Sequence, residues 1–141
     1  MLEPMLHGWQ LFDGQHIRMT GYAARVMSLS WSAGGQWLAT SVATRLVLWP
    51  FHGKDGPMGK TPRLLTPSGH RIEVVACHPR NAVVAAGYGN GLILLTRIDD
   101  SAEILAKKPG DAPVTALAWS ADGLLLAWGT EGGEAGVIDL A

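Results

Sequence analysis

The stretch that decides the fold is Val26–Trp49, VMSLSWSAGGQWLATSVATRLVLW. It contains an apolar segment that ends at Trp31, a turn with two adjacent glycines, and two further apolar segments, Trp37–Thr40 and Leu46–Trp49. Short apolar runs bounded by glycine turns and polar corners are typical of antiparallel β-strands. The stretch therefore predicts three strands joined by tight turns.

Most of the same pattern returns twice downstream, in Ile72–Leu95 (IEVVACHPRNAVVAAGYGNGLILL) and in Val114–Ile138 (VTALAWSADGLLLAWGTEGGEAGVI). His78 and Trp119 take the place that Trp31 has in the first copy. These three positions are 47 and 41 residues apart, close to the repeat of about 40 to 45 residues that is typical of four-stranded propeller blades. The sequence therefore predicts three related sheets.

Many of the predicted strands are apolar on both faces, as in Ala82–Ala86 and Leu92–Leu95. Such a strand is buried on both sides, so its sheet must lie between two others. No segment has a sustained helical spacing of apolar residues, and we expect no helix of any length. Because Pro50 lacks a backbone N–H, we expect the third strand of the first copy to end before it. The predicted fold class is all-β, with antiparallel four-stranded blades of a β-propeller.

About three blades are expected, as an incomplete or half propeller that spans the whole chain. An Asp13-Gly14 turn predicts a hairpin near the N-terminus. The expected segments are an outer hairpin of a preceding blade at residues 1–21, blades at residues 22–66 and 67–108, and a blade without its outer strand at residues 109–141.

Composition limits the class of protein and of partner. The 141 residues are 48% hydrophobic and 16% charged, with a net charge of −1. We expect no nucleic-acid partner and no membrane partner, because both would be favoured by a basic surface. The single cysteine, Cys77, is expected to be a buried apolar residue, and no secretory signal or membrane-spanning run is recognised. These features predict a cytoplasmic protein.

The repeats resemble the WD-repeat β-propeller family across almost the whole chain. In that family a Gly-His pair precedes the inner strand, a Trp-Ser-x-Asp-Gly turn follows it, a small residue lies late in the second strand, and Trp-Asp closes the third. The residues that match these positions are Gly69-His70, Trp31-Ser32, Trp119-Ser120, Asp122-Gly123, Thr40-Ser41, Gly129 and Trp49.

The chain also departs from the family pattern. Gly21-Tyr22 replaces one Gly-His pair, Pro50 follows Trp49, and Ile138-Asp139 only half matches the closing pair. The second copy has no tryptophan. The resemblance therefore implies degenerate repeats in which most of the internal hydrogen-bond network of the family is missing.

Three copies are too few to close a ring, because propellers close with about four to eight blades. Two interpretations remain open. The chain is the C-terminal part of a longer propeller, whose missing blades complete the ring, or it is a half-propeller that dimerises. In a dimer, Gln15–Thr20 of one chain would complete the Val114–Leu140 blade of the other, which gives six blades around a two-fold axis.

The resemblance implies a non-catalytic scaffold that binds a protein or peptide through its loops. In propellers, the loops that enter the inner strands and the corners between second and third strands surround one mouth of the channel. The residues at these positions are Tyr22, Arg25, Thr44, Arg45, Arg71, Asn90, Asp111 and Glu131. We predict no catalytic residues, no cofactor and no metal ligands.

The alternative is an enzyme-like or small-molecule-binding propeller that uses the central channel or the Gly53–Thr61 loop. This loop ends like a phosphate-binding loop, but five residues separate its outer glycines instead of four, and Pro62 forbids the helix that should follow. The five histidines are too scattered in sequence to indicate a metal site. His78 is expected to be packed or hydrogen-bonded, and Trp37 and Trp128 are expected to pack between blades.

Overall fold

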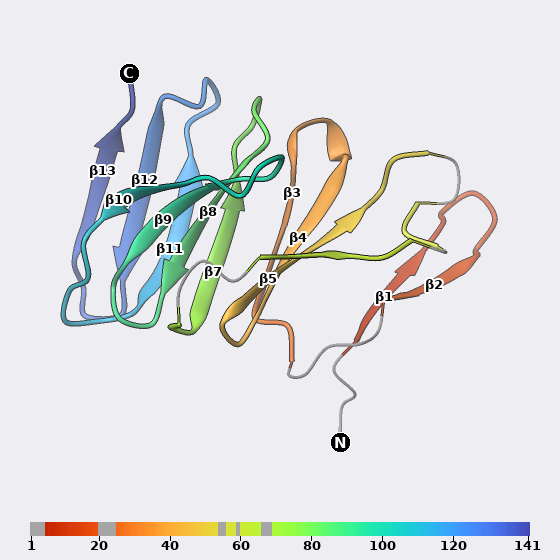
Figure 1. Ribbon diagram of the computed structural model, residues 1–141, viewed down its shortest axis with the longest axis horizontal. Helices are drawn as coiled ribbons and strands as arrows, with labels where there is room; N and C mark the ends of the chain where they lie inside the picture. Colours follow the sequence, from red (N-terminus) through yellow and green to blue (C-terminus); the bar gives the residue numbers. More distant parts are fainter. Residues whose placement is uncertain (1–4, 20–24, 54–55, 59, 66–68) are drawn as a thin grey trace.

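The computed structural model describes residues 5–19, 25–53, 56–58, 60–65 and 69–141. In these parts the chain forms thirteen β-strands and one three-residue 3-10 turn, η1 (Ala33–Gly35). The strands form one two-stranded hairpin and three larger sheets, and every pairing is antiparallel. The sheets follow one another along the long axis of the molecule (Figure 1). The predicted all-β architecture of antiparallel blades is confirmed.

Each copy of the sequence pattern forms one sheet. The first sheet has the order β3 (Ser28–Trp31), β4 (Trp37–Val42), β5 (Arg45–Pro50) and β6 (Arg63–Leu65). The second sheet has the order β7 (Ile72–Cys77), β8 (Val83–Tyr88), β9 (Ile93–Arg97) and β10 (Glu103–Lys107). The third sheet contains β11 (Val114–Trp119), β12 (Leu125–Thr130) and β13 (Ala135–Asp139).

The N-terminal hairpin consists of β1 (Leu6–Trp9) and β2 (His16–Met19), and its turn includes the predicted Asp13-Gly14 pair. One face of the hairpin packs on the first sheet, where Met19 joins a buried cluster with Val47 and Trp49. The hairpin therefore covers part of the first sheet.

The prediction that the third strand ends before Pro50 is wrong. Pro50 is the last residue of β5 and pairs with Trp37, the first residue of β4. A missing N–H is tolerated at the end of a ladder, and the next residue continues the contact, because Phe51 N donates to Gln36 O at 2.8 Å.

The core lies between the sheets, as the apolar runs predict. Leu46 and Leu48 of the first sheet pack with Ile72 and Tyr88 of the second in the largest buried cluster. A second cluster joins the second and third sheets through residues that include Ile93, Leu95, Val114 and Leu126. No helix in the described parts of the chain is long and apolar enough to cross a membrane.

The turns gather at two opposite edges of the stacked sheets (Figure 1). We call the edge with the β4–β5, β8–β9 and β12–β13 turns the lower rim, following its place in the figure. The segments that lead into β7 and β11 reach the same edge. The edge with the β3–β4, β7–β8 and β11–β12 turns is the upper rim. The two rims carry different chemistry, and each contains a hollow.

Candidate functional site

On the lower rim, three of the predicted contact residues lie around one hollow. Arg25, Thr44 and Arg71 line a depression of about 300 Å³, together with Met27 and Ala43. They come from the entry to β3, the β4–β5 turn and the entry to β7. The repeat pattern therefore identified residues that are distant in sequence and meet in space.

Backbone hydrogen bonds between neighbouring sheets hold the walls of this hollow in place. Ile72 N donates to Ala43 O at 2.8 Å, which ties the second sheet to the β4–β5 turn of the first. Gly89 N donates to Arg71 O at 2.8 Å. Ala43 has a φ of 52°, a left-handed conformation that non-glycine residues adopt rarely. The turn is thus fixed by its neighbour and presents Thr44 at the rim.

The Arg71 side chain is directed by two contacts. Its Nη2 donates to Met27 Sδ at 3.3 Å, and its Nε lies 3.5 Å from Glu73 Oε1. Both members of this ion pair are partly exposed, so the pair orients the guanidinium and contributes little stability. Arg25 and Arg45 are exposed on the same part of the rim.

The remaining predicted residues do not join the hollow. Asn90 is used within the fold, because its Oδ1 accepts from Leu92 N at 3.2 Å and its carbonyl oxygen accepts from Gly110 N at 3.0 Å. Asp111 and Glu131 are exposed in the loops around the third sheet. Tyr22 lies outside the described residues.

Charge is unevenly distributed along the lower rim. The end near the first and second sheets carries three exposed arginines and the half-buried Glu73. The end near the third sheet is mixed, with the acids Asp111, Glu131 and Glu134 and the lysines Lys107 and Lys108. The arginine-rich end is therefore the part of the rim suited to a negatively charged ligand.

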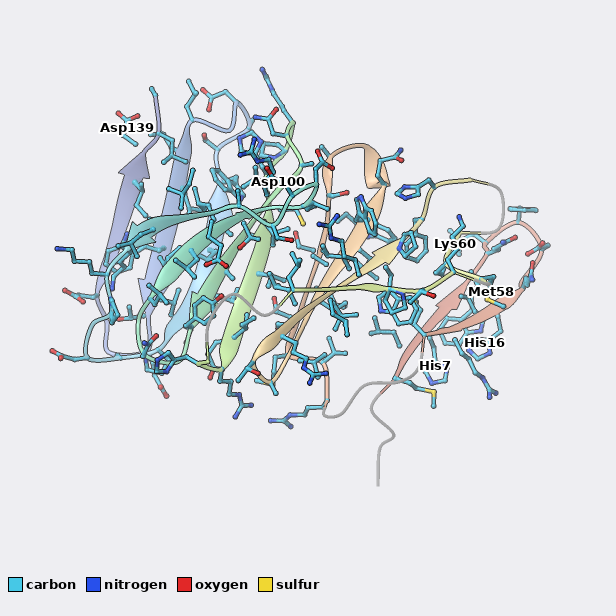
Figure 2. The ribbon with its side chains drawn as sticks, in the orientation of Figure 1. His7, His16, Met58, Lys60, Asp100 and Asp139 are labelled. Atoms are coloured by element: carbon cyan, nitrogen blue, oxygen red, sulfur yellow. The ribbon has the colours of Figure 1, made fainter. Side chains whose placement is uncertain are left out.

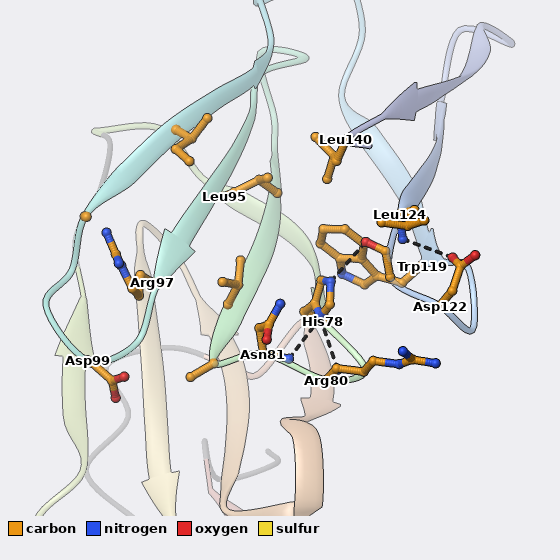
Figure 3. Close-up of a pocket in the computed structure, with 15 residues that line it drawn as sticks. His78, Arg80, Asn81, Leu95, Arg97, Asp99, Trp119, Asp122, Leu124 and Leu140 are labelled. Carbon is orange, nitrogen blue, oxygen red and sulfur yellow. Dashed lines mark hydrogen bonds between the residues drawn. The ribbon is translucent and has the colours of Figure 1, made fainter.

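The upper rim has a larger hollow, of about 790 Å³, between the second and third sheets (Figure 3). His78 and Trp119 form part of its wall, and its lining also includes Arg80, Arg97 and Leu140. The sequence indicated this region only through the unusual histidine at the position of a tryptophan.

His78 links the second sheet to the third through its ring nitrogens (Figure 3). Its Nδ1 accepts from Arg80 N at 3.1 Å and from Asn81 N at 3.0 Å. The proton of the neutral imidazole is therefore on Nε2, which donates to Gly123 O at 3.0 Å. The side chain is 8% exposed. The expected packed and hydrogen-bonded role of His78 is confirmed.

Trp119 strengthens the same contact. Its ring meets the His78 ring edge to face at a centroid distance of 4.7 Å, and its Nε1 donates to Ala76 O at 3.0 Å. Gly123 has a φ of 75°, and a Cβ at this position would overlap the His78 imidazole. We call His78, Trp119 and Gly123 the upper-rim cluster.

The two tryptophans expected between blades are partly buried there. Trp37 packs against the core between the first and second sheets and meets His52 edge to face at 4.9 Å. Trp128 packs against the core between the second and third sheets, with Lys107 Nζ 5.0 Å from its ring centroid. Both rings contribute to packing between sheets.

The described parts of the Gly53–Thr61 loop lie between two strands, β5 and β6. The Lys60 ammonium donates to the carbonyl oxygen of His52 in the same loop. The ammonium thus contacts a backbone carbonyl of the same loop, whereas the lysine of a phosphate-binding loop points at the bound phosphate.

Two glycines of the second sheet have structural roles. Gly87 has a packing role, because a Cβ there would lie 2.6 Å from a methyl group of Val114. Gly91 has a φ of 88° in the tight β8–β9 corner.

Burial and hydrogen bonding shift the pKa of several side chains in the described residues. Burial raises the pKa of the Cys77 thiol to about 11. The hydrogen bond from Ser120 Oγ, followed by that from Leu124 N, lowers the pKa of Asp122, which closes the β11–β12 turn. Desolvation lowers the pKa of His16, and the charges of His7 and Arg18 lower it further. Within the described ranges, no three His, Cys, Asp or Glu residues are grouped to hold a metal ion.

Comparisons with known proteins agree with this architecture. Residues 14–49 match the family model "WD domain, G-beta repeat". No curated protein matches the chain. A chain in a crystal structure of the mitotic checkpoint complex is similar, with 20% identity and a TM-score of 0.81 over 99% of this chain and 42% of that chain.

A second similar structure is the Cps50 (Swd1) β-propeller domain of Myceliophteria thermophila, with 23% identity and a TM-score of 0.76. The match covers 96% of this chain and 45% of that chain. The chain therefore spans less than half the length of either solved protein, and these identities show the fold alone. Residues 14–49 thus match a WD repeat, and strands β3 to β13 form antiparallel blades of a β-propeller fold.

Proposed function

We propose that this chain is a non-catalytic protein-interaction scaffold that binds an acidic peptide segment at the arginine-rich end of its lower rim. WD-repeat propellers are typically scaffolds of this kind; one similar chain lies in a complex, and the other is a β-propeller domain. The observation that carries the proposal is the hollow between Arg25, Thr44 and Arg71. It joins two guanidinium groups, a hydroxyl and an apolar wall in one place.

The chemistry of the hollow fits a carboxylate followed by an apolar side chain. Guanidinium groups bind carboxylates through paired, charge-assisted hydrogen bonds. Arginine is also frequent among the residues that contribute most to protein–protein binding. Met27 offers a polarisable thioether that adapts to different apolar side chains. Arg45, exposed beside the hollow, extends the positive surface for a second acidic residue.

The proposal is tested with two fluorescein-labelled 12-residue peptides of equal apolar content, one rich in Asp and Glu and one rich in Lys and Arg. Fluorescence anisotropy should show saturable binding of the acidic peptide only. The double variant Arg25→Ala/Arg71→Ala should weaken that binding by about tenfold or more, because two charge-assisted contacts are lost.

The matched control is Arg80→Ala/Arg97→Ala, which removes two exposed arginines from the hollow of the upper rim. We expect this variant to bind the acidic peptide like the wild type. Equal binding of both peptides, or an equal loss in both double variants, would show that the lower rim does not select an acidic segment.

We also propose that the two outward apolar faces are covered by further propeller blades. Leu29 and Trp31 of β3 are 52% and 54% exposed, and at the other end of the stack Val137 of β13 is 64% exposed. The blades belong either to a longer protein or to a second copy. A dimer that completes the third sheet with β2 would have to use the edge of β2 that β1 does not occupy. Light scattering over a dilution series distinguishes a dimer from a monomer.

A further inference from the structure

The N-terminal hairpin has two faces of different character. Ile17 and Met19 are buried towards the first sheet, and neighbouring residues of a strand point to opposite faces. His7, Trp9 and His16 therefore share the outward face. Trp9 is the direct partner of His16 across the hairpin, so that His7 and His16 are diagonal neighbours.

The imidazole rings of this pair are close and nearly parallel. His7 Nδ1 lies 2.8 Å from His16 Nε2. The ring centroids are 4.9 Å apart with an interplanar angle of 8°, and Figure 2 shows both side chains on the hairpin. The two histidines are nine residues apart in sequence, and only the register of the hairpin brings their nitrogens together.

The separation of the nitrogens matches a particular coordination geometry. With metal–nitrogen bonds of about 2.0 Å, ligands at adjacent corners of a square lie about 2.8 Å apart, and ligands of a tetrahedron about 3.3 Å apart. Square-planar and tetragonal sites with nitrogen and oxygen ligands are typical of Cu(II) and Ni(II). We propose that His7 and His16 form a chelating surface site for a divalent transition-metal ion of the Cu(II) or Ni(II) class.

The surroundings define the rest of the coordination sphere. In the parts of the chain that the structure describes, no third His, Cys, Asp or Glu completes the site, so water or a group of a binding partner fills the other positions. Arg18, the direct partner of His7, is exposed on the same face and is the unfavourable charge near the ion. The metal replaces the hydrogen bond between the rings. The proton that lay between the two nitrogens moves through solvent to the other nitrogen of the same ring, so that both ligands are neutral imidazoles.

Trp9 provides a built-in reporter. Its ring is stacked 5.0 Å from that of His16 and 6.0 Å from that of His7. An open-shell ion bound by the pair would quench Trp9 fluorescence at short range. The experiment titrates CuCl₂ into the 141-residue chain in a buffer that does not coordinate copper, and follows tryptophan fluorescence and the electron paramagnetic resonance spectrum.

The variants His7→Phe and His16→Phe keep an aromatic ring in the stack and remove one ligand each. The matched control is His52→Phe, because His52 also contacts a tryptophan, Trp37 at 4.9 Å, but has no second histidine beside its ring. Each loss of a chelating ligand should weaken copper binding by about tenfold or more.

The expected result is saturable quenching at one equivalent, with two nitrogen ligands in the resonance spectrum. In His7→Phe and in His16→Phe the quenching should require about tenfold more copper or higher and the two-nitrogen spectrum should be lost, whereas His52→Phe should retain both signals. Three results would overturn the site: no saturable binding by the wild type, binding retained in either hairpin variant, or equal loss in the His52→Phe control.

Discussion

The two rims of the propeller blades use their polar side chains in different ways. On the upper rim, both ring nitrogens of His78 are hydrogen-bonded inside the protein, and Trp119 donates to a carbonyl of the adjacent sheet. On the lower rim, Arg25 and Arg71 are exposed and line a hollow, and Arg45 is also exposed. Groups that are fully used within the fold stabilise it, whereas exposed groups remain available for a partner.

The largest loss of stability is expected when a methyl group is added at Gly123, inside the upper-rim cluster. In Gly123→Ala, a residue with a φ of 75° gains a Cβ that overlaps the His78 ring. Left-handed backbone strain and overpacking together should lower the free energy of unfolding by about 2 to 5 kcal/mol. Urea denaturation followed by circular dichroism measures this loss.

The control for this change is Gly133→Ala in the lower-rim β12–β13 turn. Gly133 has a φ of 91°, but no atom lies within 4 Å of an added Cβ. Only the backbone term remains, so we expect a loss of about 1 to 2 kcal/mol. Equal losses in the two variants would show that the contact between Gly123 and His78 is not tight.

The next effect is the removal of the ring that covers His78. Trp119→Ala should cost about 3 kcal/mol, at the lower end of the range for large-to-small changes, because the ring is only half-buried. Trp119→Phe keeps a ring against His78 and loses the Nε1 hydrogen bond, for about 1 kcal/mol. A loss below about 0.5 kcal/mol for Trp119→Ala would mean that the strand register is wrong.

Cys77, directly before His78, gives a smaller effect that depends on pH. Its N–H donates to Ser30 Oγ at 2.9 Å, and burial raises the pKa of its thiol from 9.0 to about 11. The unfolded chain therefore loses the thiol proton first as the pH rises. The free energy of unfolding has its full value below pH 9 and should fall by about 1.4 kcal/mol for each unit between pH 9 and 11.

This dependence is measured by urea denaturation at several pH values in wild type and in Cys77→Ala. The variant lacks the thiol, and the difference between the two proteins should decrease over that interval. A constant difference from pH 8 to pH 11 would mean that the thiol is open to solvent between the first and second sheets.

Much of the fold follows from local sequence, because strand alternation and glycine turns act over a few residues. The prediction for Pro50 was wrong because a proline interrupts a strand only where its N–H is needed for pairing. Pro50 pairs with Trp37, the first residue of β4, so it lies at the end of the ladder, where the missing N–H is tolerated.

The proximity of Arg25, Thr44 and Arg71 was predictable, because the repeat pattern places equivalent turns at the same edge of the stacked sheets. The contact between His78 and Gly123 spans 45 residues and depends on a turn conformation in another sheet, so spacing alone does not reveal it.

The pairing of His7 with His16 was missed for a related reason. Metal sites are recognised in sequence by close ligand spacing, and these histidines are separated by the whole hairpin turn. A shift of the strand register by one residue would put them on opposite faces. Their proximity is a property of the register and cannot be deduced from the positions alone.

The central claim is that the lower rim binds an acidic peptide, whereas the contacts of the upper rim stabilise the fold. It is tested most directly by measuring acidic-peptide affinity and the free energy of unfolding on the same preparation of Arg25→Ala/Arg71→Ala. We predict that affinity falls by about tenfold or more while stability changes by less than about 0.5 kcal/mol. Unchanged affinity, or a loss of stability above about 1 kcal/mol, would contradict this division between the rims.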